Sequence, residues 1–302
     1  MSFASALIWQ ILVLVGKLPM RVRVAVGRFA GGFYGSLPSR ERRIATAQLT
    51  QFLGPTSASQ GTLRGIFASV GVTLMESLNL NPYLNQSTLH IECSERERIR
   101  ALAASNSGAL FLSAHTSNWD LLAAWGISEF GLKIFPIGRP ARSALLHRLL
   151  LKLRSAYGAE TIWRNDRGGA RELLRVLRSG GCLAALIDQD TRVKGVFAPF
   201  FGRAALTPVS LVELAVREQT PIFAAFAFRT APLHYRVFIK ELDKQLPPAQ
   251  ILTAYNLELE RLIRQFPEQW VWFHKRWRSL PDGRTLGTSE YLSYLENQED
   301  AA

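Results

Sequence analysis

The pattern of hydrophobic positions divides the chain into a helical first third and a longer part in which strands and helices alternate. Between residues 40 and 105 apolar side chains recur at helical spacing, with Gly54-Pro55 and Asn81-Pro82 as breaks. After that come short, almost continuously apolar runs, which are typical of parallel strands covered on both faces. These runs predict strands at 109–114, 133–137, 160–163, 182–187, 222–228 and 235–239.

Helical patterns lie between and after these runs, at 121–127, 141–156, 171–178, 209–217 and 249–265. Alternation of strands and helices is the pattern of an α/β fold. We therefore expect a largely parallel central sheet flanked by helices, with an N-terminal amphipathic or membrane-associated helix. No linker rich in Pro, Gly or Ser divides the chain, so residues 36–302 are expected to form a single α/β domain.

Residues 1–35 have a different character. The first 16 residues carry no charge, but they are fewer than the roughly 20 needed to cross a bilayer, and they lack the features of a signal peptide. Helical spacing relates Phe3, Leu7, Ile8, Ile11, Leu12 and Val15, and the basic residues Lys17, Arg21, Arg23 and Arg28 follow. The pattern predicts a helix that lies in, or dips into, an anionic membrane surface. The alternative is a helix packed on the protein's own core.

Composition and charge narrow the classes of protein. With 48% hydrophobic residues the chain can bury a sizeable core, and two cysteines form neither a disulfide framework nor a metal site, which favours a reducing compartment. The net charge of +12 comes from two regions. Residues 17–43 hold seven basic residues against Glu41, and residues 139–178 hold ten against three acidic ones. These two basic regions are expected to bind anionic partners, such as phosphate head groups, an acidic carrier protein or nucleic acid. The alternative is that both regions are solvated surface.

The sequence lacks the motifs of several familiar enzyme classes. It contains no G-x-S-x-G elbow, Walker A loop, G-x-G-x-x-G or H-E-x-x-H motif, and its five histidines are scattered. Hydrolase, nucleotide-binding and zinc-enzyme functions are therefore disfavoured, and no metal is expected.

Two predicted strands end in functional groups. The run 109–114 leads into His115, and the run 182–187 leads into Asp188-Gln189-Asp190. If both strands are parallel, the imidazole and the carboxylates lie at one edge of the sheet, where α/β proteins bind ligands.

Asp120 follows His115 by five residues, just before the predicted helix 121–127. It is expected to fix the imidazole tautomer and so leave His115 as a general base for a substrate hydroxyl. Ser117-x-x-Asp120 is also a capping box, and both interpretations can hold together. No Ser or Cys nucleophile is indicated, so direct transfer is the simpler mechanism.

The H-x4-D motif from His115 to Asp120 resembles the signature of lysophospholipid and glycerolipid acyltransferases. Further segments are similar to the bacterial lipid A late acyltransferase family, which transfers lauroyl or myristoyl groups. These segments are Gly138-Arg139-Pro140, Asp188-Gln189-Asp190, Pro199-Phe200-Phe201-Gly202 with Thr207, and the aromatic cluster 270–278. Phosphatidylinositol mannoside acyltransferases belong to the same superfamily.

The resemblance implies an α/β acyltransferase at the cytoplasmic face of the bacterial inner membrane. It would need no cofactor and would move an acyl chain from acyl carrier protein or acyl-coenzyme A to a hydroxyl of a glycolipid such as a lipid A precursor. A lysophospholipid or a phosphatidylinositol mannoside is the alternative acceptor. His115 and Asp120 carry over as the catalytic pair. Residues expected to bind substrate or stabilise charge are Asn118, Arg139, Asp188, Gln189 and Arg229.

A stripe of four arginines, Arg167, Arg171, Arg175 and Arg178, follows helical spacing. It could dock an acidic carrier protein, or it could be a solvated helix face. The competing class of function is a non-catalytic basic protein that binds membrane or nucleic acid. Nucleic-acid binders interleave basic and aromatic residues or carry a recognised module, and neither is found, so no nucleic-acid partner is expected.

Overall fold

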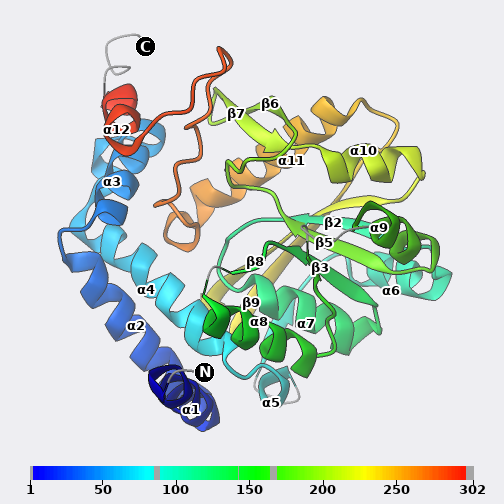
Figure 1. Ribbon diagram of the computed structural model, residues 1–302, viewed down its shortest axis with the longest axis horizontal. Coiled ribbons are helices and arrows are strands. Elements are labelled where there is room, and N and C mark those ends of the chain that lie inside the picture. Colours follow the sequence, from blue (N-terminus) through cyan, green and yellow to red (C-terminus); the bar gives the residue numbers. More distant parts are fainter. Residues whose placement is uncertain (1–2, 85–88, 142, 164–168, 297–302) are drawn as a thin grey trace.

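A seven-stranded sheet lies at the centre of the molecule (Figure 1). The computed structural model describes residues 3–84, 89–141, 143–163 and 169–296, and for residues 3–9, 82 and 83 it describes the backbone alone. The strands follow the order β1-β9-β8-β2-β5-β3-β4, and a separate hairpin pairs β6 with β7. Their bounds are β1 His90–Glu92, β2 Ala109–Ser113, β3 Ile134–Gly138, β4 Ile162–Trp163, β5 Cys182–Leu186, β6 Gly195–Phe200, β7 Arg203–Pro208, β8 Ile222–Ala231 and β9 His234–Leu242.

The sheet is largely parallel, as predicted. β2 runs parallel to both β5 and β8, and β3 runs parallel to β4 and β5. The exceptions are β9 and β1. β9 is antiparallel to β8 because only two residues separate them, too few for a crossover, and β1 runs parallel to β9. All six predicted strands are present. The sequence analysis missed β1, a three-residue edge strand without an apolar pattern, and the β6–β7 hairpin.

Helices surround this sheet, and every helix predicted from residue 121 onward is confirmed. The segment from 40 to 105 is mainly helical, as expected, although Asn81-Pro82 begins α5 instead of ending a helix. The bounds are α1 Phe3–Lys17, α2 Met20–Ser36, α3 Arg40–Leu53, η1 Pro55–Ala58, α4 Gln60–Ser77, α5 Asn81–Leu84, α6 Arg96–Ser105, α7 Trp119–Phe130, α8 Ala144–Ala156, α9 Gly169–Arg178, α10 Ser210–Arg217, α11 Pro248–Gln265, η2 Pro267–Gln269 and α12 Thr288–Glu296.

The two faces of the sheet are covered by different helices. Leu110 and Leu112 of β2 pack with α9, α10 and α11, whereas Phe111 packs with α6 and α7 on the other face. The five residues of β2 are all buried, which explains their continuous apolar pattern. This burial places the carboxyl end of β2 near the middle of the sheet, next to β5 and β8.

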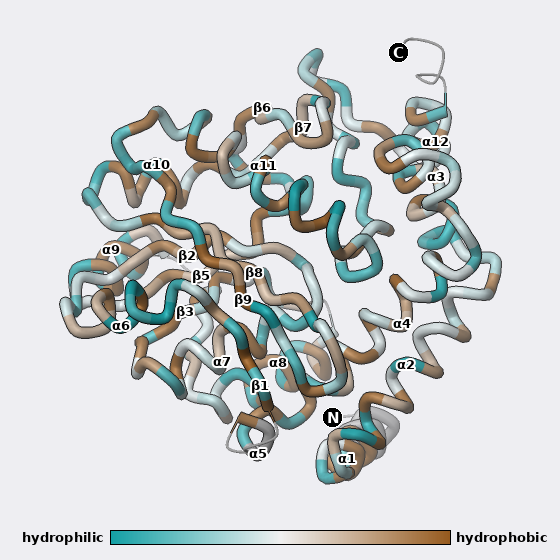
Figure 2. Tube along the Cα trace, turned by 180° about the vertical axis from the view of Figure 1, so that it is seen from behind, coloured by the Kyte–Doolittle hydropathy of each residue, from teal (hydrophilic) through white to brown (hydrophobic). Residues whose placement is uncertain are grey.

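The N-terminal helices lie beside this core (Figures 1 and 2). α2 packs against α4 through glycines: a Cβ added at Gly27 would collide with the carbonyl of Gly71, so the two backbones touch. No helix among the described residues is both long and apolar enough to span a membrane. α1 is helical, but Phe3, Leu7 and Ile8 lie outside the side chains that the structure describes, and the amphipathic arrangement and the boundary at residue 35 stay predictions.

Candidate active site

His115 and Asp188 meet at the carboxyl edge of the sheet. β2 and β5 are parallel neighbours in register, with Ser113 opposite Leu186, so the residues two positions beyond each strand lie side by side. His115 Nδ1 lies 2.8 Å from Asp188 Oδ1, and the His115 backbone N–H donates to Oδ2 at 2.9 Å. Parallel pairing therefore brings the imidazole and this carboxylate together, as expected from the two strand ends.

Asp188 is an ionised carboxylate inside the protein. Its side chain is 1% exposed, and Trp270 Nε1 donates to its Oδ2 at 2.9 Å. Burial by itself would raise its pKa, but attraction to His115 and hydrogen bonds from His115 and Trp270 outweigh burial and lower the pKa to about 2. An ionised carboxylate can only accept hydrogen bonds. Nδ1 of His115 must therefore carry the proton, which leaves Nε2 as the basic nitrogen.

Asp120 does not hold the imidazole, contrary to the sequence expectation. Its Oδ1 accepts hydrogen bonds from Arg154 Nε at 3.1 Å and from the Tyr157 hydroxyl at 2.9 Å. Burial and the charge of Asp120 together raise the pKa of Tyr157 well above its ordinary value, so the phenol stays protonated. Among the described contacts, the partner of Asp120 is thus the Arg154 guanidinium, and the partner of His115 is Asp188.

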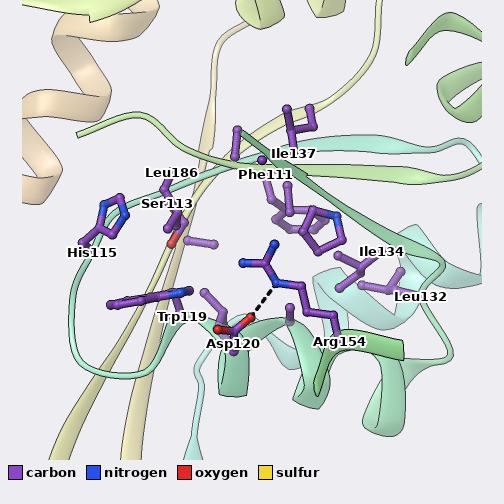
Figure 3. Close-up of a pocket in the computed structure, with 18 of the residues that line it drawn as sticks. Phe111, Ser113, His115, Trp119, Asp120, Leu132, Ile134, Ile137, Arg154 and Leu186 are labelled. Atoms are coloured by element: carbon purple, nitrogen blue, oxygen red, sulfur yellow. Dashed lines mark hydrogen bonds and ion pairs between the residues drawn. The ribbon is translucent and has the colours of Figure 1, made fainter. Parts of the chain in front are cut away.

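The start of α7 explains this difference. Asn118, not Ser117, is the N-cap, because its Oδ1 accepts from the Leu121 N–H at 2.9 Å. The expected capping box of Ser117 and Asp120 is therefore wrong. Asp120 is the second residue of the helix and its carboxylate faces Arg154 of α8, as Figure 3 shows.

A deep cavity of about 320 Å³ opens beside His115 (Figure 3). Polar side chains gather where strands end or helices begin: His115 after β2, Arg139 after β3, Gln189 after β5, and Asp120 near the start of α7. Arg154 joins them from α8, its guanidinium directed into the cavity. The rest of the wall is mainly apolar and includes Ile99, Phe111, Leu122, Trp125, Phe130, Leu132, Ile134, Ala184, Leu186, Ala225 and Ile239. The cavity thus combines charged groups at its rim with a hydrophobic interior.

The other predicted residues lie elsewhere. Asn118 is fully buried, and besides capping α7 it donates to Glu76 Oε2 at 3.1 Å. Arg229 pairs with the same carboxylate, its Nη2 lying 2.7 Å from Glu76 Oε2, and both side chains are almost completely buried. Burial would lower the pKa of Arg229, but Glu76 outweighs it and raises the pKa. Neither Asn118 nor Arg229 lines the cavity, and the charge of Arg229 is already balanced by that of Glu76.

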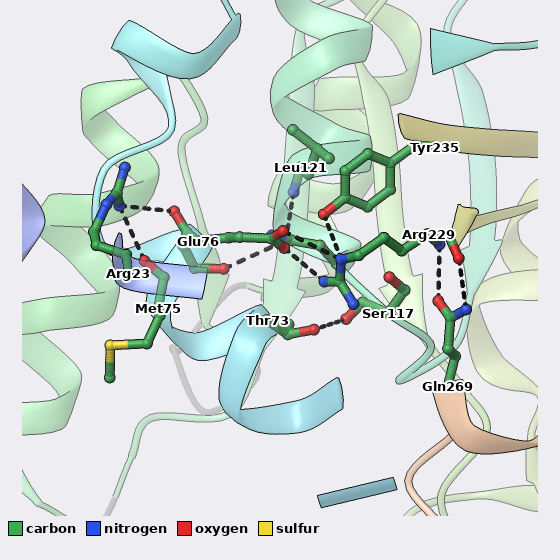
Figure 4. A network of polar contacts seen from close by, with 11 residues as sticks. Arg23, Thr73, Met75, Glu76, Ser117, Leu121, Arg229, Tyr235 and Gln269 are labelled. Atoms are coloured by element: carbon green, nitrogen blue, oxygen red, sulfur yellow. Dashed lines mark hydrogen bonds and ion pairs between the residues drawn. The ribbon is translucent and has the colours of Figure 1, made fainter. Parts of the chain in front are cut away.

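These contacts fix the loop that carries His115 (Figure 4). The Ser117 carbonyl accepts from Thr73 of α4, and the Ser117 N–H donates to the Gln269 carbonyl at 2.8 Å. The Gln269 side chain in turn pairs with the backbone of Arg229. The loop is held by α4, β8 and η2 together, so the position of the imidazole is set by the whole fold.

The aromatic cluster 270–278 is a structural core above Asp188. Trp270, Trp272 and Trp277 are at most 2% exposed. Arg276 is fully buried, and its guanidinium donates to the Leu206 carbonyl and the Thr207 hydroxyl of β7. Burial lowers the pKa of His274 to about 4, so it is a neutral packed residue. Asp190 accepts from Ser279 and Arg278, which ties this cluster to the strand end that presents Asp188.

The arginine stripe is described in part, because Arg167 lies outside the described residues. Arg171, Arg175 and Arg178 are exposed on α9, but Arg175 pairs with Glu172, and Arg178 pairs with Glu218 at 2.9 Å. Arg178 ends α9 just before β5 begins, so it lies at the amino edge of the sheet, opposite to His115. Arg171 is nearer the carboxyl edge.

Sequence reasoning missed three residues of the site. Arg154 and Tyr157 lie 34 and 37 positions after Asp120, and Trp270 lies 82 positions after Asp188. No local spacing connects such pairs. The one available signal was the basic residue Arg154 in the last turn of a predicted helix. Among the described residues, no cluster of three or more His, Cys, Asp or Glu side chains could hold a metal.

The chain matches the family of bacterial lipid A biosynthesis acyltransferases over residues 2–279. It is 24% identical to a lipid A biosynthesis lauroyltransferase of Escherichia coli, with 90% of each chain covered. It is 23% identical to a lipid A biosynthesis acyltransferase of Haemophilus influenzae, over 91% of this chain and 87% of that protein. A phosphatidylinositol mannoside acyltransferase of Mycolicibacterium smegmatis is 22% identical over 78% of this chain and 79% of its own. With a family match that spans most of its length, the chain belongs to the bacterial lipid A biosynthesis acyltransferase family and is an acyltransferase.

Proposed function

We propose that this protein moves a fatty acyl chain from acyl carrier protein, or from acyl-coenzyme A, to a hydroxyl of a lipid A precursor at the cytoplasmic face of the inner membrane. The main support for this proposal is the position of the His115 imidazole. It is hydrogen-bonded to Asp188 and lies at the rim of a deep apolar cavity. Such a cavity can hold a hydrocarbon chain, while the charged rim binds the reacting thioester carbonyl. The family names of the relatives fit this chemistry, and they make a non-catalytic function untenable.

The reaction starts with proton removal by His115. Nε2 accepts the proton of the acceptor hydroxyl, and Asp188 stabilises the imidazolium that results. The hydroxyl oxygen bonds to the thioester carbonyl carbon, the carbon–sulfur bond breaks, and the imidazolium returns the proton to the leaving sulfur. An acyl–oxygen bond thus replaces an acyl–sulfur bond, and the carrier leaves as a free thiol.

Arg154 supplies a positive charge to the site, in addition to Arg139 at the rim. The Arg154 Nε donates to Asp120, which also accepts from the Tyr157 hydroxyl, and its Nη1 lies 3.5 Å from Thr161 Oγ1. The guanidinium is directed into the cavity. Its N–H groups are placed to stabilise the negative charge that develops on the carbonyl oxygen. Asp120 therefore acts as a positioning residue for Arg154.

Direct transfer agrees with the surroundings of the one serine that lines the cavity among the described residues. The side-chain hydroxyl of Ser113 has no hydrogen bond to His115 or to any other described group. A serine nucleophile needs a base within hydrogen-bonding distance. A covalent acyl-enzyme intermediate is therefore not part of the proposed mechanism.

We expect an apolar stripe on α1, on α2 and on the turn between them to contact the membrane. Its residues are Ile11, Leu14, Leu18, Val22, Val26, Phe29 and Phe33, each at least 42% exposed. The glycine contacts with α4 turn the other side of α2 inward, so this face has no described cover. Lys17, Arg21 and Arg28 are exposed on the same helices and suit anionic head groups.

Phe29→Glu combined with Phe33→Glu is expected to weaken binding to vesicles rich in phosphatidylglycerol about tenfold or more, because two exposed phenyl rings no longer enter the lipid. Vesicle co-sedimentation measures the effect. The control is Leu257→Glu, on α11, where the side chain is about as exposed as that of Phe33; this variant should bind vesicles as the wild type does. If all the variants sediment alike, this surface does not bind the membrane.

The acyl carrier protein would dock beside Arg171, at the end of α9 closer to the cavity rim. Reversing Arg171 and Arg175 to Glu is expected to raise the KM for an acyl-carrier-protein donor several-fold and to change the KM for acyl-coenzyme A little, because only the protein presents a broad acidic face. Steady-state kinetics with both donors checks this. Reversal of Arg217 and Arg261, exposed on α10 and α11, is the control. Equal effects on both donors, or none, would make the stripe a solvated helix face.

The function is tested by incubating the purified full-length chain with dodecanoyl and tetradecanoyl donors and three acceptors. These are a lipid A precursor, a phosphatidylinositol mannoside and a lysophospholipid. Mass spectrometry should find one added acyl chain on the lipid A precursor. Acylation of another acceptor in preference to it would overturn the proposed acceptor, and a folded protein that acylates none of them would overturn the function.

A further inference from the structure

A second cleft, of about 310 Å³, lies between α2, α4, η2 and the turn that joins β8 to β9. Its size falls within the roughly 300–1,000 Å³ typical of sites for small molecules. It shares no lining residue with the cavity beside His115. Its wall includes Arg229 and Gln269, which Figure 4 shows in the network that fixes the His115 loop. The cleft is therefore a separate site at the back of this loop.

This cleft is lined by one cation and one anion that are not paired with each other. Arg28 of α2 and Glu268 of η2 both line it, and both side chains are exposed. Their charges attract, but among the described contacts no ion pair joins them, and neither has another hydrogen-bond partner. The guanidinium of Arg229 is already paired with Glu76. The charges that the cleft offers to a ligand are thus one guanidinium and one carboxylate.

The Glu268 carboxylate lies against the backbone of α4. A Cβ built at Gly65 would collide with this carboxylate, so the glycine lets it lie close to the helix. Burial raises the pKa of Glu268, and the charge of Arg28 offsets this only in part. A partly desolvated carboxylate is stabilised by hydrogen-bond donors, and no described group donates to this one. A primary ammonium group would supply three N–H donors.

The cleft adjoins the surface that is expected to contact the membrane. Arg28 is next in the chain to Phe29, which is 77% exposed in the apolar stripe of α2. Successive helical residues differ by about 100° around the axis, so Arg28 lies on the flank of α2 that leads from the stripe to the cleft. A lipid whose chains lie beside the stripe would present its head group at this flank.

We propose that this cleft binds an aminoalkyl phosphate head group such as phosphoethanolamine, with the phosphate on Arg28 and the primary ammonium on Glu268. A purely anionic ligand would be repelled by Glu268 and a purely cationic one by Arg28, whereas a zwitterion is attracted by both. The adjoining stripe favours a membrane phospholipid over the free compound. The inference rests on the membrane contact in the proposed function, and it adds a lipid that the protein selects apart from its acceptor.

The test is co-sedimentation of the full-length chain with two kinds of vesicle. Both contain the same fraction of phosphatidylglycerol, and the remainder is phosphatidylethanolamine in one and phosphatidylcholine, whose nitrogen has no N–H donor, in the other. The wild type should bind the ethanolamine vesicles about tenfold more tightly, as expected for a charge-assisted hydrogen bond. Glu268→Gln should lose most of this preference, because a neutral amide is a weaker acceptor. Glu160→Gln, which changes another exposed carboxylate, should keep it.

A second variant tests the geometry without changing a charge. Gly65→Ala places a methyl group where the carboxylate lies, so the preference should fall as in Glu268→Gln, while alanine favours the helix. Gly61→Ala is the matched control on the same helix, because its new methyl group would meet only Ser59 Oγ, at 3.7 Å. If Gly65→Ala melts below the wild type, Glu268→Gln decides.

Several results would overturn the inference. Equal binding of both vesicles by the wild type leaves the cleft without a selected head group. The same ethanolamine preference in the wild type and in Glu268→Gln would assign it to the bulk lipid. Soluble phosphoethanolamine that binds as tightly as the vesicles would make the free compound the ligand and exclude the lipid. These results leave the proposed function standing, whereas a wild type that sediments with neither vesicle would overturn its membrane contact as well.

Discussion

Replacing His115 with Ala is expected to reduce acyl transfer by about 10²–10⁴-fold, the contribution typical of a positioned general base. Among the described residues that line the cavity, no other side chain is placed to act as the base. Arg154 is a cation, and Asp120 is engaged by Arg154 and Tyr157. The substitution also leaves Asp188 buried without its main partner, so thermal melting must accompany the kinetics.

The matched control is His274→Ala, which removes an imidazole from the same region that is neutral and packed. Its transfer rate should exceed that of His115→Ala by at least about tenfold at equal folded fraction. A folded His115→Ala protein with near-normal transfer would refute the proposed base.

Asp188→Asn is expected to lower transfer to a similar extent, up to roughly 10⁴-fold, because an amide can donate to Nδ1 and thereby shift the ring proton to Nε2, the wrong tautomer for a base. Nitrogen-15 NMR of the histidine rings reads the tautomer directly. Asp120→Asn is the comparison: it disturbs Arg154 and should leave the His115 tautomer unchanged. If Asp120→Asn alone alters the tautomer, the sequence-based pairing of His115 with Asp120 would be right after all.

Asp188→Asn is also expected to change how the stability of the protein depends on pH in acid. The pKa of Asp188 falls from 3.8 to about 2 in the folded protein, so the unfolded chain binds more protons between these values. Asp188 therefore stabilises the fold above about pH 4, and this stabilisation is lost as the pH falls toward 2. In Asp188→Asn the free energy of unfolding should fall less steeply over that interval. Denaturant unfolding at a series of pH values measures the slope, and an unchanged slope would refute the assignment.

Much of the fold follows from local patterns. A strand buried on both faces must be apolar at every position, which is why β2 and β5 could be recognised and why the polar residues that follow them could be placed at one edge. The short edge strand β1 could not be recognised from the sequence, because His90 and Glu92 are exposed and the strand has no hydrophobic pattern. In the β6–β7 hairpin, much of the burial comes from the distant aromatic cluster around Trp277.

The sequence by itself determined the α/β class, the family resemblance and the position of His115 at a strand end, because each rests on residues that are close together in the chain. It could not determine which carboxylate serves the histidine. Local spacing favoured Asp120, whereas the parallel pairing of β2 with β5 brings Asp188 to the imidazole and leaves Asp120 to Arg154. The unpaired hydroxyl of Ser113 was equally invisible, since an unpaired group exists only relative to the walls around it. Partners of polar side chains are chosen among groups brought near by strand order and helix packing, and those are properties of the tertiary structure.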